Sequence, residues 1–180
     1  MKSRKKNKPY TILFICSGNS CRSPMAEGLL RKKFYAKYGD QVRIHSAGIL
    51  GIDGNPATLA AIEAAKEKGV DISTHQSRGI KKADVAEADI IFALAENHKE
   101  YLDQHFSRYK ENMFLLKTFA TESDKPKKVS IDDPIGQGLK VYRRTINEID
   151  KELNRILPQL EKLINFKLFL YYYHFIFDDE

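Results

Sequence analysis

Four short apolar runs along the chain predict strands of a sheet. The first, residues 11–15, is apolar at nearly every position, which indicates a strand buried on both faces, as in a parallel sheet. The other predicted strands are residues 42–44, 90–94 and 113–116. The polar residues 121–128 predict a long loop after the last of them.

Amphipathic segments between these runs predict helices. The first is expected from Pro24 to about Tyr38, with Ser23 as its N-cap. The other expected helices are residues 56–69, 96–106 and 141–163. Pro158 is expected to kink the last of them or to end its regular part. The alternation predicts an α/β fold, a single domain with a four-stranded, mostly parallel sheet and helices on both faces.

Composition and charge place the chain among soluble globular proteins. Its 180 residues suffice for one domain with a hydrophobic core. The formal net charge is +6, and part of it lies in residues 1–9, which we expect to be a basic flexible arm. No aromatic residue lies among these charges to stack on bases, so no nucleic acid partner is expected.

The two cysteines, Cys16 and Cys21, form neither a disulfide framework nor a zinc motif. No metal and no cofactor are expected. The apolar run after the basic start is too short for a secretory signal, which favours a reducing, cytoplasmic location.

Residues 16–22, called here the phosphate loop, have the features of an anion site. The loop consists of Cys16, Ser17, Gly18, Asn19, Ser20, Cys21 and Arg22. It follows a predicted strand and leads into a helix N-terminus, where backbone N–H groups and the helix dipole favour an anion. A cation and a helix N-terminus also lower a thiol pKa, so we expect Cys16 to be a thiolate nucleophile. Arg22 can bind two phosphate oxygens at once.

The segment from Cys16 to Glu27, CSGNSCRSPMAE, resembles the signature of the low-molecular-weight protein phosphatases. The resemblance is closest to the bacterial protein-arginine phosphatase branch. It continues at residues 46–48, at His75 and at residues 133–134, and it covers residues 10–164, which we take as the domain. It implies the phosphotyrosine protein phosphatase I-like fold and a cysteinyl-phosphate intermediate.

The resemblance also implies roles for residues outside the phosphate loop. Asp133, before Pro134, would give a proton to the leaving group and later activate water, and Asp132 is its rival by position. A hydrogen-bonded network of Asn19, Ser23, Ser46 and His75 would hold the loop in shape. For His75 a place in a surface loop is the alternative. The remaining histidines, His45, His98, His105 and His174, belong to no motif and are expected to be structural or exposed.

Cys21 has two possible roles. It is either a packed small side chain or the partner of a reversible disulfide that protects Cys16 from over-oxidation. The family resemblance supports the protective role.

Two positions bear on the substrate. Ser20, before Cys21, is small where tyrosine-directed relatives carry a bulky aliphatic residue, and this favours phosphoarginine on a protein substrate. Ile135 departs from both branches: tyrosine-directed relatives often carry an aromatic ring there that can stack on phosphotyrosine, and arginine-directed relatives often carry Phe. Phosphotyrosine is the alternative substrate. Two rival functions are an arsenate reductase that uses an external thiol, since no cysteine follows Cys21, and a non-catalytic phosphate-binding module.

Residues 165–180 form an aromatic-rich tail beyond the resemblance. Its apolar part is shorter than the roughly 20 residues that a membrane span needs, so no span is expected. The tail could extend the last helix and pack on the domain, add a strand, contact a partner or membrane surface, or aggregate.

Overall fold

Among the described residues the sheet has four strands, and all of them are parallel. The computed structural model describes the backbone of residues 8–121 and 127–177 and side chains as far as residue 173; most of the predicted arm and loop 121–128 lie outside the described residues. The strands are β1 (Tyr10–Cys16), β2 (Val42–Gly48), β3 (Ile90–Ala93) and β4 (Met113–Leu115), in the order β2-β1-β3-β4. The predicted four-stranded α/β fold is confirmed.

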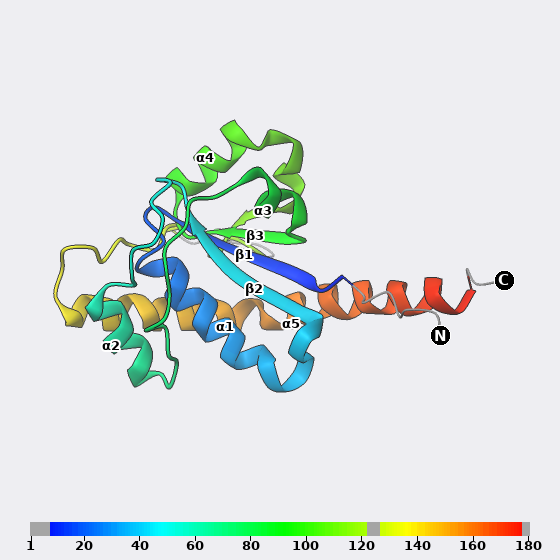
Figure 1. The fold of residues 1–180 in the computed structure, drawn as a ribbon, viewed down its shortest axis with the longest axis horizontal. Coiled ribbons are helices and arrows are strands. Elements are labelled where there is room, and N and C mark those ends of the chain that lie inside the picture. The colour runs from blue at the N-terminus through cyan, green and yellow to red at the C-terminus, as the bar shows by residue number, and fades with distance from the viewer. Residues whose placement is uncertain (1–7, 122–126, 178–180) are drawn as a thin grey trace.

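In the part of the chain that the structure describes, five α-helices connect and cover these strands (Figure 1). They are α1 (Arg22–Tyr38), α2 (Leu59–Glu67), α3 (Lys82–Glu87), α4 (Glu96–His105) and α5 (Leu139–Phe177). Short 3-10 helices occupy Gly39–Gln41 and Ser107–Asn112. The sequence pattern did not predict α3, which has six residues and one buried position, Val85.

Two predicted helix starts are wrong. Helical hydrogen bonding in α1 begins earlier than expected, with the Met25 N–H donating to the Cys21 carbonyl at 3.3 Å. Ser23 therefore lies inside the first turn and is not the N-cap. In the second helix, Pro56 instead forms an isolated bridge with Gln76, and Thr58 caps α2 by accepting from the Ala61 N–H.

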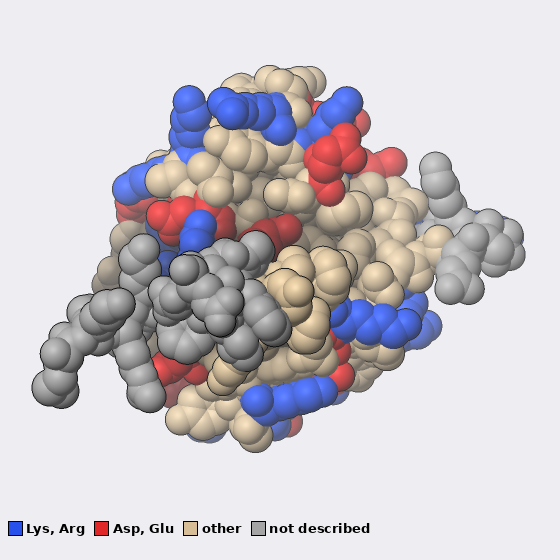
Figure 2. All heavy atoms as spheres, turned by 90° about the vertical axis from the view of Figure 1, so that its right-hand side faces the viewer, with Lys and Arg blue, Asp and Glu red and all other residues tan. Residues whose placement is uncertain are grey.

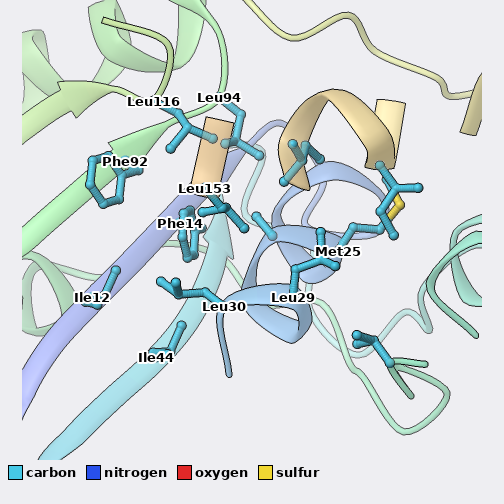
Figure 3. Close-up of a cluster of buried hydrophobic side chains, with 14 of the residues drawn as sticks. Ile12, Phe14, Met25, Leu29, Leu30, Ile44, Phe92, Leu94, Leu116 and Leu153 are labelled. Atoms are coloured by element: carbon cyan, nitrogen blue, oxygen red, sulfur yellow. The ribbon is translucent and has the colours of Figure 1, made fainter. Parts of the chain in front are cut away.

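The alternation of side chains along β1 builds a core on each face of the sheet. All seven β1 residues are buried. Ile12, Phe14 and Cys16 face the layer of α1, α2 and α5, where Phe14 packs with Leu30 and Leu153 (Figure 3). Leu13 and Ile15 face the layer of α3 and α4. Both cores pack against β1, and this packing fixes the position of its last residue, Cys16.

Helix α5 is longer than predicted and passes through Pro158 without ending. Its last turns continue beyond the sheet, beside the start of β1 (Figure 1). Lys167 pairs with Asp89 and lies over the Tyr10 ring, and Leu168 packs against the core. Of the four expectations for the tail, extension of the last helix is thus confirmed for residues 165–177, and the added strand is wrong.

Figure 2 views the end of the molecule at which α5 finishes. Basic and acidic side chains are interspersed there, and uncharged surface lies between them. No helix among the described residues is long and apolar enough to cross a membrane.

Candidate functional site: the phosphate loop

The phosphate loop lies at the carboxyl end of β1, which is one of the two central strands of the sheet. Cys16 ends β1 and Arg22 begins α1. β1 is flanked by β2 on one side and β3 on the other, the position at which parallel α/β sheets bind ligands. Loop carbonyls accept hydrogen bonds from outside the loop: Cys16 from the Ile49 N–H at 3.0 Å and Ser20 from the Thr58 N–H at 3.0 Å.

Asn19 is the centre of a network that shapes the loop. It is buried and adopts a left-handed backbone with φ of 54°, which asparagine tolerates better than most residues. Its side-chain amide donates to Ser23 Oγ and to Ser46 Oγ, both at 2.8 Å. Ser46 Oγ in turn donates to Glu27, a member of the network that the sequence pattern did not reveal.

The segment before α3 closes the network from the other side. His75 Nε2 lies 2.7 Å from the Asn19 carbonyl oxygen, which can only accept, so this nitrogen carries the proton. The Arg78 N–H donates to Asn19 Oδ1 at 3.0 Å. The structure thus places Asn19, Ser23, Ser46 and His75 together, as the resemblance implied, and His75 is no isolated surface residue.

Gly48 brings the end of β2 against the phosphate loop. A Cβ there would lie 2.6 Å from the Ser17 carbonyl oxygen and 3.0 Å from the Asn19 nitrogen. Real Cβ atoms do not approach backbone this closely, so this position requires glycine.

The Cys16 thiol is buried, and Ser23 Oγ lies 3.0 Å from its sulfur. Because Ser23 Oγ accepts from Asn19, its own hydrogen is available to the sulfur. Burial raises the pKa of the thiol, while Ser23, Arg22 and the Asn19 backbone oppose that rise. Removal of the sulfur from water thus opposes the lowered pKa that the loop and helix N-terminus led us to expect, and the thiolate depends on Ser23, Arg22 and the Asn19 backbone.

Arg22, the last residue of the phosphate loop, forms an ion pair with Asp133. Arg22 Nη2 contacts the Asp133 carboxylate, and Nη1 donates to the Ile131 carbonyl at 3.1 Å. Asp133 is half-buried, with 38% of its side chain exposed. The rival Asp132 is more exposed and pairs with Lys128, away from Arg22.

Ser17 connects Arg22 to His98, a histidine that belongs to none of the sequence motifs. Ser17 Oγ accepts from Arg22 Nη2 at 3.2 Å and lies 2.9 Å from His98 Nε2. His98 is fully buried, and burial together with the Arg22 charge lowers its pKa to about 3. Its position just after β3 was the available signal, because the strand beside β1 ends next to the phosphate loop.

Cys21 lies in a different environment from Cys16. It is buried, and its sulfur is 3.5 Å from Thr58 Oγ1 and 3.4 Å from the Tyr142 hydroxyl. Ser20 Oγ is 3.7 Å from the same sulfur.

Ile135, the other position that bears on the substrate, is 56% exposed. Among the described residues, no group of three or more Cys, His, Asp or Glu could hold a metal ion.

This arrangement combines three elements of phosphoryl-transfer chemistry. A thiol ends a strand, a guanidinium begins the following helix, and a half-exposed carboxylate lies against that guanidinium. Together they can supply a nucleophile, a bidentate anion ligand and a proton donor within one small volume.

Comparison with known proteins agrees with this geometry. The family described as low molecular weight phosphotyrosine protein phosphatase matches residues 11–165. A protein-arginine-phosphatase of Geobacillus stearothermophilus is 35% identical, with 85% of this chain and 97% of the relative covered. The solved YwlE arginine phosphatase of the same organism superposes with a TM-score of 0.75 and 34% identity, covering 86% of this chain and 94% of that one. Arsenate reductase 2 of Staphylococcus epidermidis is 36% identical, with 77% and 89% covered.

Proposed function

Because this chain belongs to the low molecular weight phosphotyrosine protein phosphatase family of cysteine-dependent protein phosphatases, we propose that its substrates are phosphoarginine residues of proteins. In this proposal Cys16 is the nucleophile, Arg22 binds the phosphoryl oxygens, and Asp133 is the general acid and base. The observation that carries it is the contact of Asp133 with Arg22, because it brings a carboxylate from a distant segment to the end of the Cys16 strand.

The proposed reaction has two steps. The Cys16 thiolate attacks phosphorus, the P–N bond breaks, and Asp133 gives its proton to the leaving guanidine nitrogen. Asp133 then takes a proton from water, which attacks the cysteinyl phosphate, so that the S–P bond breaks and inorganic phosphate leaves. Arg22 and the loop N–H groups stabilise the charge of the phosphoryl group in both steps. A reducing, cytoplasmic location suits a nucleophile that must remain an unoxidised thiol.

The choice of phosphoarginine depends on Ser20, whereas Ile135 bears only against stacking on phosphotyrosine. Ser20 leaves space beside Cys21 that a bulky aliphatic residue would fill. Ile135 is exposed next to Asp133 but offers no aromatic ring for phosphotyrosine. Two relatives named protein-arginine-phosphatase align with this chain over nearly their whole length, which supports the same choice. The relative named arsenate reductase keeps the external-thiol alternative open as an outcome of the test.

The test compares phosphoarginine and phosphotyrosine peptides as substrates of the wild type and of Ser20→Ile. We expect the wild type to have the higher kcat/KM on phosphoarginine and the variant to shift toward phosphotyrosine. Cys16→Ser should abolish turnover, and Asp133→Asn should lower kcat by about 100-fold or more. A wild-type preference for phosphotyrosine would refute the substrate assignment.

A second measurement separates the rival functions. Phosphate binding without Cys16-dependent turnover would show a binding module instead of an enzyme. Reduction of arsenate with glutathione, faster than hydrolysis of either peptide, would show the reductase.

A further inference from the structure

His98 contacts the phosphate loop, although no step of the proposed reaction uses it. It lies in the first turn of α4, and its ring is fully buried with Nε2 2.9 Å from Ser17 Oγ. β3 precedes α4 and pairs with β1, so the ends of two neighbouring strands bring His98 and Ser17 together. The pairing of β1 with β3 therefore fixes the positions of the two residues that make this contact.

The contacts of Ser17 indicate which group donates. Arg22 Nη2 must donate to Ser17 Oγ, because a guanidinium has no acceptor. Within the part of the chain that the structure describes, His98 Nδ1 is buried and has no hydrogen-bond partner. Among backbone groups a buried N–H without a partner is rarer than a buried acceptor without one, and we extend this preference to the imidazole ring. The proton therefore belongs on Nε2, and Ser17 Oγ accepts from both His98 and Arg22.

We propose that His98 is a positioning residue that, through Ser17 Oγ, fixes the Arg22 guanidinium over the phosphate loop. The inference rests on the proposed function in one respect, that Arg22 is the phosphate ligand. Arg22 is held on its other side by Ile131 and Asp133. Asp133 is half-exposed and exchanges a proton in each turnover, so the buried contact through Ser17 and His98 is the fixed one.

A neutral ring suits this role. The lowered pKa of His98, about 3, keeps the imidazole uncharged at neutral pH. An imidazolium there would repel the Arg22 guanidinium and compete with it for the phosphate anion.

The experiment measures the affinity of the full chain for inorganic phosphate by calorimetry, together with kcat/KM. His98→Ala should weaken both by about threefold to tenfold, the effect of losing one hydrogen bond. His98→Gln should recover most of the loss, because its amide N–H can take the place of Nε2–H. His105→Ala, an exposed histidine on the same helix, is the matched control and should change neither quantity.

A double-mutant cycle separates positioning from a merely structural role. If His98 acts through Ser17, then His98→Ala should have no further effect on phosphate affinity in a Ser17→Ala background. Additive losses would overturn the proposal, as would unchanged phosphate affinity in His98→Ala.

Two further measurements decide the matter should His98→Ala fail to fold. Two-bond proton–nitrogen NMR spectra of the wild type should place the His98 proton on Nε2, and a proton on Nδ1 would contradict the donor assignment. His98→Gln should retain phosphate affinity, and its loss in the folded protein would also contradict the proposal. Phosphate affinity needs no turnover, so absence of Cys16-dependent hydrolysis would refute the proposed function without deciding the role of His98.

Discussion

Gly48 has no room for a side chain, because the phosphate loop packs directly on its backbone. We predict that Gly48→Ala displaces the loop, since the added Cβ would meet the backbone of Ser17 and Asn19, and neither can move alone. The cost should be about 1–3 kcal/mol of unfolding free energy, with at least a tenfold loss of turnover. Urea denaturation and kcat/KM measure the two effects.

The matched control is Gly138→Ala, where a Cβ would meet no atom within 4 Å. It should leave both quantities nearly unchanged. If Gly48→Ala also left turnover unchanged, the close approach would not constrain the loop.

Ser23 affects the reactivity of Cys16 directly. Its hydroxyl lies 3.0 Å from the Cys16 sulfur, and this hydrogen bond lowers a thiol pKa that burial raises. Ser23→Ala should therefore raise the pKa further, because the lost hydroxyl donor stabilises the thiolate more than the neutral thiol. Alkylation by iodoacetamide requires the thiolate, so its pH profile at Cys16, followed by mass spectrometry, should move to higher pH.

The exposed Ser73→Ala is the control for the alkylation profile. A profile for Ser23→Ala that stays in place or moves to lower pH would mean that Ser23 does not stabilise the thiolate.

Helix α2 depends on its N-cap, and the cap also borders the phosphate loop. Thr58 Oγ1 accepts from the Ala61 N–H, and the Thr58 N–H donates to the Ser20 carbonyl. Thr58→Ala should lower the unfolding free energy by about 1 kcal/mol, because one N–H at the helix start loses its partner. Thr58→Ser keeps the hydroxyl and should lose less than half of that. Equal losses in the two variants would assign the effect to the methyl group instead of the cap.

The sequence predicted those elements whose local pattern agrees with their packing. Residues 11–15 were apolar throughout, and β1 is buried throughout. The predicted starts of α1 and α2 were wrong, because proline and serine indicate a helix start only from the neighbouring sequence. Contacts with distant residues can override that signal, and Pro56 instead forms a bridge with Gln76. Helix α3 buries only Val85, so its pattern offered no amphipathic signal.

The difference between local sequence patterns and tertiary contacts also separates the predicted from the unpredicted residues of the site. Its contiguous part, residues 16–23, was predictable, because strand end, small residues and helix start lie in one stretch of sequence. Glu27, Arg78 and His98 were not foreseen as site residues. Arg78 and His98 reach the loop only through tertiary packing, and Glu27 of α1 joins the network through Ser46 of β2.

At the scale of the whole molecule, the end of α5 and the phosphate loop lie at opposite ends of β1. Lys167 lies over Tyr10, the first residue of β1, whereas Cys16 is the last. Deleting residues 166–180 removes the pair with Asp89 and the packing of Leu168. We predict a loss of about 1–3 kcal/mol in unfolding free energy. We expect kcat/KM on a small aryl phosphate to change by less than about twofold.

The truncation should also raise solubility. Phe166, Phe169 and Tyr172 are each more than 60% exposed, and large exposed aromatic side chains promote association. The variant Lys167→Met isolates the ion pair, and it should account for only part of the lost stability because Leu168 still packs. Light scattering and urea denaturation measure the two effects. A large fall in turnover for the truncated, folded chain would contradict the separation of α5's end from the site and would mean that it supports the phosphate loop through the length of the sheet.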